Sequence, residues 1–214
     1  QGDSLITLNA LDQELNRLGV SSANSGTARA TNLRMSARAG VRQDLLPWID
    51  AMEQIIPEGT TVALDSTQLA YAAHTVMACD TPRSWLAPFG FGTLGCALPM
   101  AIGAAIADST KPVLALAGDG GWLFTVAEMA AAIDEGVDIV VVLWDNRGYA
   151  QIRDSFDEVH APRMGVDVSS HDPTAIARGF GWNAVDVTTV EAFSIVLAEA
   201  FEHRGAHFIR ISVS

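Results

Sequence analysis

Two apolar runs that each lead into polar residues constrain the fold of this chain more than any other feature. Residues 113–117 precede a Gly-Asp-Gly triplet at 118–120, and residues 139–144 are followed closely by Asn146. Short apolar runs bounded by turn residues predict buried parallel strands, and the segment between them is long enough for a crossover helix. In an open α/β sheet, ligands bind outside the carboxyl ends of the strands. We therefore expect Asp119 and Asn146, which are 27 residues apart, to meet in one crevice.

The alternation of strand and helix patterns continues along the chain. Further strands are predicted at residues 61–64, 184–187 and 208–213, and helices at residues 43–56, 98–107 and 149–157. Helix starts are indicated by three pairs of residues, namely Thr125 with Glu128, Asp172 with Pro173, and Thr188 with Glu191. Gly136 is expected to close the helix that follows Thr125. This order predicts an α/β fold with a doubly wound, mostly parallel sheet and helices on both faces.

The amino-terminal part of the chain has a different pattern. Leucines spaced three and four apart predict an amphipathic helix over residues 5–18, which Gly19 would end. Residues 20–40 are rich in Ser, Ala, Asn, Thr, Gly and Arg without an apolar period, which is typical of a linker. We therefore predict an appendage of helix and linker over residues 1–40 and one large domain over residues 41–214.

Composition narrows the classes of function. With 49% hydrophobic and 18% charged residues, the 214-residue chain can bury a full core. Its formal net charge of −12 argues against a surface for nucleic acid or anionic membrane, so an anionic ligand would need a helix start or a bound cation. We expect a cytoplasmic protein for three reasons. The chain has two cysteines, it has no apolar run long enough for a membrane span, and we recognise no leader.

The crevice has the residue types of a magnesium site. Mg²⁺ prefers oxygen ligands and is usually held by one or two protein groups plus substrate phosphates. Asp119, the amide oxygen of Asn146 and the carbonyl of Gly148 are the expected protein ligands. A Gly-Asp-Gly triplet alone is most often only a turn. The added strands, helix and amide make a metal-diphosphate site the better interpretation.

Two longer stretches carry a family resemblance. GDGGWLFTVAEMAAAIDEGVDIVVVLWDNRGY and the upstream FGTLGCALPMAIGAAIA resemble the carboxyl-terminal, diphosphate-binding domain of thiamine-diphosphate enzymes of the acetolactate synthase, benzoylformate decarboxylase and pyruvate decarboxylase family. The resemblance covers residues 41–214 and implies thiamine diphosphate and Mg²⁺ as cofactors. ALDSTQ, SWLAPFGFGTLG and GYAQIRD most resemble decarboxylases of 2-oxo acids such as 5-guanidino-2-oxopentanoate.

The resemblance also implies roles for individual residues. Asp119, Asn146 and Gly148 would bind the metal, and Leu94 would wedge between the two cofactor rings to keep the cofactor bent. The implied cofactor-binding residues are Thr67, Gln68, Gly92, Leu94, Gly118, Asp119, Gly120, Gly121, Trp122, Asn146, Gly148, Tyr149 and Ile152. Thr67 and Gln68 would touch the diphosphate, and Gly121 and Trp122 would offer it N–H groups.

The resemblance further implies that this chain is half of an active site. The family activates thiamine with a glutamate on a separate pyrimidine-binding domain, for which residues 1–40 are too short, and it forms its sites between two subunits. We therefore expect a pyrimidine-binding domain or subunit, a homodimer and a 2-oxo acid substrate. Asp145 departs from the usual Asn-Asn pair; it could tighten metal binding or cap the turn, and we favour the cap.

Two alternatives remain open on the sequence. The domain could be a non-catalytic module that binds a diphosphate or nucleotide with the same fold. A Rossmann dehydrogenase is less favoured, because GFGTLG at residues 90–95 does not directly follow an apolar strand.

Overall fold

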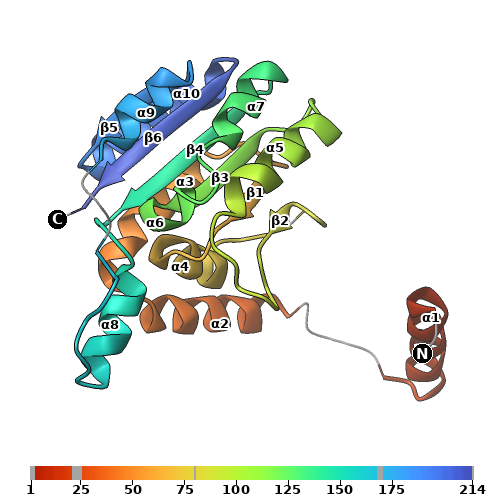
Figure 1. The fold of residues 1–214 in the computed structure, drawn as a ribbon. Coiled ribbons are helices and arrows are strands. Elements are labelled where there is room, and N and C mark those ends of the chain that lie inside the picture. Colours follow the sequence, from red (N-terminus) through yellow and green to blue (C-terminus); the bar gives the residue numbers. More distant parts are fainter. Residues whose placement is uncertain (1–2, 21–25, 80, 168–170, 214) are drawn as a thin grey trace.

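The computed structural model describes residues 3–20, 26–79, 81–167 and 171–213, and it contains a six-stranded parallel sheet in the order β2-β1-β3-β4-β6-β5. The strands are β1 Thr61–Leu64, β2 Trp85–Leu86, β3 Val113–Gly118, β4 Ile139–Asp145, β5 Asn183–Val187 and β6 Ala206–Ser212. The predicted doubly wound α/β fold is confirmed (Figure 1).

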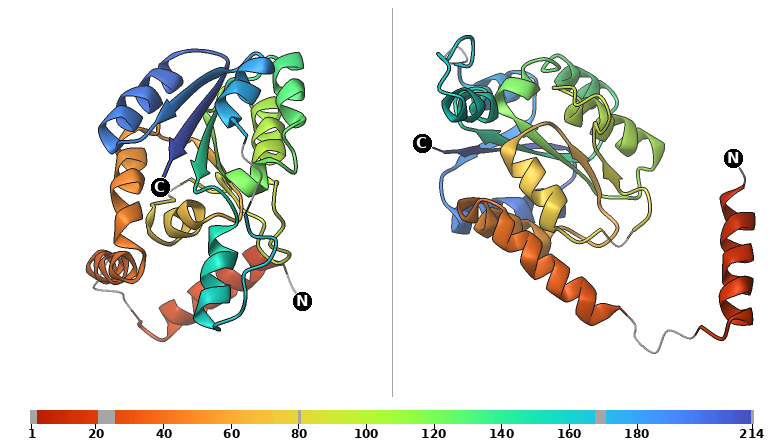
Figure 2. Two further views of the ribbon diagram at one scale, coloured as in Figure 1. Left: turned by 60° about the vertical axis from the view of Figure 1, so that its left-hand side comes forward. Right: turned by 90° about the horizontal axis from the view of Figure 1, so that it is seen from below.

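Helices connect the strands and cover both faces of the sheet (Figure 2). They are α1 Ser4–Arg17, α2 Thr27–Gly40, a 3₁₀ turn Gln43–Leu45, α3 Leu46–Ile55, α4 Gln68–Val76, α5 Ala97–Ala107, α6 Asp119–Trp122, α7 Glu128–Asp134, α8 Ala150–Glu158, α9 Pro173–Gly179 and α10 Val190–Glu202. No helix among the described residues has the length and apolarity to cross a membrane.

The side-chain alternation of the strands divides the core into two layers. Leu114 and Leu116 of β3 face a cluster built with α3, α4 and α10, whereas Ala115 and Ala117 face a cluster built with α5, α7 and α9. Small residues on the second face let the Ala-rich helix α5 lie close to β1 and β3. The central strands β3 and β4 are thus buried on both faces, as expected for parallel strands covered by helices.

The amino-terminal prediction is partly wrong. Helix α1 forms as predicted, with Gly19 at φ 67° after its end, and no side chain of α1 is buried. The predicted linker, in contrast, contains α2 in its described part; its Ala, Arg, Leu and Met residues favour helix. Arg38 of α2 pairs with Asp50 of α3, which fixes α2 on the domain (Figure 1).

Two of the predicted capping pairs are also wrong. Thr125 donates its hydroxyl to the carbonyl of Gly95, 2.8 Å away, and does not cap α7. Helix α10 is capped by Thr189, one residue later than predicted, whose Oγ1 accepts from the N–H of Ala192. The cap by Asp172 and the end at Gly136 are confirmed.

Candidate functional site

A pocket of about 250 Å³ lies at the carboxyl ends of β1, β3 and β4. It is lined by Ser66, Thr67, Gln68, Tyr71, Gly92, Leu94, Gly118, Asp119, Gly120, Gly121, Asn146, Gly148, Tyr149, Ala150, Gln151 and Ile152. The structure therefore brings all the sequence-predicted site residues to one place except Trp122. This follows from parallel pairing of β3 with β4, which puts their carboxyl ends side by side.

Asp119 is buried at the end of β3, where its carboxylate is held by main-chain N–H groups. Oδ1 accepts from Gly120 at 2.9 Å and Oδ2 accepts from Gly148 at 2.6 Å. Burial raises the pKa of Asp119 to about 6; the two N–H groups oppose this rise, and the charge of Asp145 adds to it. A cation in the pocket would favour the ionised carboxylate.

Asn146 presents a buried oxygen that has no hydrogen-bond partner among the described residues. Its Nδ2 donates to Oε1 of Gln68 at 3.4 Å, which leaves Oδ1 as the unsatisfied atom. Because an unsatisfied buried acceptor is costly, this atom calls for a ligand. An amide oxygen in the pocket that Asp119 also lines fits Mg²⁺.

The protein ligands alone do not complete a metal site. In the described part of the chain, no group of three His, Cys, Asp or Glu side chains could hold a metal ion. A site with one carboxylate, one amide and a carbonyl from Gly148 depends on oxygens from a bound anion. This donor set fits a magnesium–diphosphate pair better than a structural metal.

The glycines around Asp119 are required by close packing within the protein. A Cβ on Gly118 would lie 2.9 Å from Oγ1 of Thr67, and one on Gly121 would lie 2.7 Å from Oδ2 of Asp65. A Cβ on Gly120 would overlap the ring of Tyr149. Each glycine thus lets a wall of the pocket approach the loop after β3.

Asp65, which sequence reasoning did not single out, joins two of these walls. It lies at the end of β1 and is buried, and its carboxylate accepts from the N–H groups of Ser66 at 2.7 Å and Gly95 at 2.9 Å. Burial raises its pKa, and these hydrogen bonds oppose the shift. The carboxylate thereby ties the Thr67 loop to the loop that carries Leu94. The sequence signal that could have identified Asp65 is its position directly after the predicted strand at residues 61–64.

Arg153 of α8 is a second residue that the sequence did not indicate. Its guanidinium donates to the carbonyl of Asn146 at 2.8 Å and lies 3.4 Å from Asp167. Tyr149 precedes α8 and places its ring against Gly120, whereas Ile152 is 49% exposed beside the pocket. Helix α8 thus forms one wall and also holds the loop of Asn146.

Trp122 lies apart from the pocket. Its side chain is buried in the core, with its ring centroid 5.4 Å from that of Phe208 and 6.3 Å from that of His171. Only a main-chain contribution from this residue is compatible with its orientation. Asp145 caps the turn as favoured from the sequence, because its Oδ1 accepts from the N–H of Arg147 at 3.0 Å.

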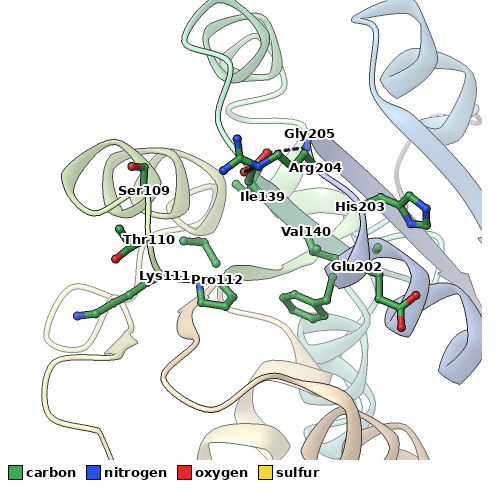
Figure 3. Close-up of a pocket in the computed structure, with 14 residues that line it drawn as sticks. Ser109, Thr110, Lys111, Pro112, Ile139, Val140, Glu202, His203, Arg204 and Gly205 are labelled. Carbon is green, nitrogen blue, oxygen red and sulfur yellow. Dashed lines mark hydrogen bonds and ion pairs between the residues drawn. The ribbon is translucent and has the colours of Figure 1, made fainter.

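Other hollows are less suited to chemistry. One of about 230 Å³, shown in Figure 3, lies at the amino ends of β3, β4 and β6. Its polar groups already have protein partners: Asp138 accepts from the N–H of Gly205 and lies 3.4 Å from Arg204, and Lys111 lies 3.4 Å from Asp108. A hollow of about 310 Å³, which includes Phe89 and Phe91, adjoins the 250 Å³ pocket and shares Ser66, Tyr71 and Gly92 with it.

Comparison with known proteins gives the family. The model of the thiamine pyrophosphate enzyme, C-terminal TPP binding domain, matches residues 65–211. The chain belongs to this family. Thiamine pyrophosphate is the same compound as thiamine diphosphate, so the family agrees with the resemblance noted from the sequence.

Relatives of this TPP-binding domain are enzymes. It is 37% identical over 188 residues to the probable 2-ketoarginine decarboxylase AruI of Pseudomonas aeruginosa, covering 85% of this chain and 33% of that protein. It is 26% identical to the acetolactate synthase isozyme 1 large subunit of Escherichia coli, covering 77% and 30% of the two chains. The chain spans about a third of the length of these relatives.

A solved structure shares the fold of the TPP-binding domain. The thiamine diphosphate-dependent 4-hydroxybenzoylformate decarboxylase of Rhodococcus jostii RHA1 superposes with a TM-score of 0.73 at 23% identity. The match covers 78% of this chain and 32% of that one. The shared architecture therefore includes the sheet and the helices on both of its faces.

Proposed function

We propose that this chain binds thiamine diphosphate with Mg²⁺ in the 250 Å³ pocket and serves as the cofactor domain of a 2-oxo acid decarboxylase or an acetolactate-synthase-like carboligase. The observation that carries the proposal is the unsatisfied Oδ1 of Asn146, which belongs to the same pocket as the buried carboxylate of Asp119. Asp119, Asn146 and the carbonyl of Gly148 would hold the metal. Thr67, Gln68 and the N–H groups near Gly121 would hold the diphosphate.

The bound thiamine would accept electrons when a 2-oxo acid loses CO₂, and the protein would supply orientation and electrostatics. Leu94, half-buried at the pocket, would act as the wedge that bends the cofactor. Similarity to the 2-ketoarginine decarboxylase supports a 2-oxo acid with a guanidino group as the first substrate to test.

A pyrimidine-binding domain or subunit would complete the site, within a homodimer. Large exposed aromatic side chains lie near the pocket. Phe91 is 94% exposed and Phe89 66%, and both line the adjoining 310 Å³ hollow; Phe124, next to Gly95, is 65% exposed. Exposed apolar surface of this kind marks an interaction site. We propose that this face receives the domain that carries the activating glutamate.

Calorimetry tests the cofactor assignment. Thiamine diphosphate should bind the wild-type chain in the presence of Mg²⁺ and much more weakly with EDTA. Asn146→Ala should reduce the affinity by about 10–100-fold, because the metal loses a ligand. The control is Asn32→Ala on the exposed face of α2, which should bind as the wild type does. A thiamine diphosphate affinity that changes neither on removal of Mg²⁺ nor in Asn146→Ala would contradict the assignment.

Turnover tests the catalytic part of the proposal. The chain joined to a pyrimidine-binding domain should release CO₂ from at least one acid in a panel of 2-oxo acids that includes the guanidino compound. Cofactor binding without release from any acid would favour the non-catalytic module.

A further inference from the structure

An ion pair lies directly behind the proposed metal loop. Arg210 of β6 reaches Oδ2 of Asp145 with two nitrogens, Nε at 2.7 Å and Nη2 at 2.6 Å. The side chains are largely buried, with 17% of Arg210 and 6% of Asp145 exposed. The guanidinium also lies 3.2 Å from Oδ1 of Asp186 on β5. Two carboxylates on the strands that flank β6, one on β4 and one on β5, thus fix the orientation of one arginine.

The second oxygen of Asp145 connects this pair to the loop. Oδ1 accepts from the N–H of Arg147, which adopts a left-handed conformation at φ 58°. Asn146 lies between these two residues, so the cap determines how its side chain is presented. A carboxylate next to a metal ligand could itself turn toward a cation. Here both oxygens of Asp145 are engaged, Oδ1 by the N–H of Arg147 and Oδ2 by Arg210.

We propose that Arg210 is a positioning residue for the metal loop, holding Asp145 as the cap of the turn so that Asn146 presents the oxygen to the cation. This inference rests on the proposed function. It explains how the chain carries an aspartate at position 145, since the arginine balances the added negative charge. Removing one partner of a buried ion pair leaves an uncompensated charge, whereas removing both does not.

A double-mutant cycle tests the proposal. The variants are Arg210→Met, Asp145→Asn and the two combined, and the measurements are Mn²⁺ affinity by EPR with thiamine diphosphate and the exchange rate of the Arg147 amide without metal. Arg210→Met should weaken Mn²⁺ binding by about tenfold or more and speed exchange. The double variant should return to within about threefold of the wild type, because an amide at position 145 still accepts from Arg147 and neither charge of the buried Arg210–Asp145 pair is left without the other.

Arg210→Lys should keep most of the affinity, because it retains the charge. The control is Arg38→Met, which breaks the partly exposed ion pair between Arg38 of α2 and Asp50 of α3. Neither residue lines the pocket, so Mn²⁺ affinity should be unchanged. If Arg210→Met fails to fold, the comparison of Asp145→Asn with the double variant decides. Asp145→Asn leaves the partly exposed Asp186 as the remaining anionic partner of Arg210 in this pair, so excess positive charge stays behind the metal loop and this variant should bind Mn²⁺ more weakly than the double variant.

The outcomes separate the two proposals. A wild-type chain that takes up no Mn²⁺ overturns the proposed function, while amide exchange of Arg147 still reports on the cap. Wild-type affinity in folded Arg210→Met, equal affinities of Asp145→Asn and the double variant, or Arg147 exchange that is unaffected by Arg210→Met overturns the role of Arg210.

Discussion

Gly148 has a backbone conformation that a side chain would oppose. Its φ is 143°, and a Cβ would lie 2.5 Å from the carbonyl oxygen of Val166, a main-chain atom that cannot move alone. Gly148→Ala should therefore lower the free energy of unfolding by at least about 2 kcal/mol, through strain and overpacking. Denaturant unfolding measures the change. The displaced loop should also weaken Mg²⁺-dependent binding of thiamine diphosphate.

Gly103 provides the matched control for this substitution. It lies within α5, and nothing lies within 4 Å of the position where a Cβ would be added. Gly103→Ala should stabilise the protein by about 0.5–1 kcal/mol, because alanine is the better helix former. Equal losses of stability in the two variants would contradict the argument from Gly148.

The two cysteines should differ in reactivity. Burial, with the nearby charge of Asp65 adding to it, raises the pKa of the Cys96 thiol to about 11. At pH 8 only about one Cys96 thiol in a thousand is therefore ionised, and the thiolate is the reactive form. Exposed Cys79 should be alkylated first by iodoacetamide, as peptide mass mapping would show. The rate at Cys96 should rise about tenfold per pH unit between pH 8 and 10. A plateau in that range would contradict the raised pKa.

Among individual residues, the sequence predicted those that line the pocket but not those that hold them in place. Asp119 and Asn146 could be paired because each follows a strong strand signal. Arg210 and Arg153 could not, because their partners depend on strand order and on where α8 lies. Arg210 is a charged residue within the predicted strand at 208–213, which indicated that its side chain would need a partner. The sequence did not indicate that this partner is Asp145.

Among the elements, α10 shows how one position changes a cap. Both Thr188 and Thr189 could start this helix, and of the two only Thr189 caps it, because its Oγ1 accepts from the N–H of Ala192. Thr189→Ala should cost about 1 kcal/mol of stability, the usual value of a lost cap. Thr188→Ala at the exposed neighbour should change stability by less than about 0.5 kcal/mol. Thermal unfolding measures both, and the reverse order would restore the cap predicted from the sequence.

Helix α2 and strand β2 show which elements sequence patterns miss. Residues 20–40 lack an apolar period, yet α2 forms, because helix propensity and contacts of Ala37 and Arg38 with the domain suffice. Strand β2 has only two residues and exists through its pairing with β1. The longer strands were predicted to within one or two residues, because continuous apolar runs identify strands that are buried on both faces.

In the whole molecule, the amino-terminal helix contributes least to the packed body. No side chain of α1 is buried, and α1 lies away from the sheet (Figures 1 and 2). Helix α2 differs, since Ala37 packs against the core and Arg38 pairs with both Asp50 and Glu53. We therefore predict that the stably folded domain begins near the start of α2. The sequence pattern predicts a later position for this domain boundary, at residue 40.

Truncation tests this boundary. A chain that begins at Gly26 should unfold within about 2 °C of the intact chain, because none of the described residues 3–20 is buried and about 1 kcal/mol corresponds to 2–4 °C for a chain of this size. A chain that begins at Val41 loses α2 and should unfold at least about 2–4 °C lower. Scanning calorimetry gives both values. Equal midpoints for the two truncations would place the boundary at residue 40, whereas a large loss in the first would mean that α1 packs on the domain in solution.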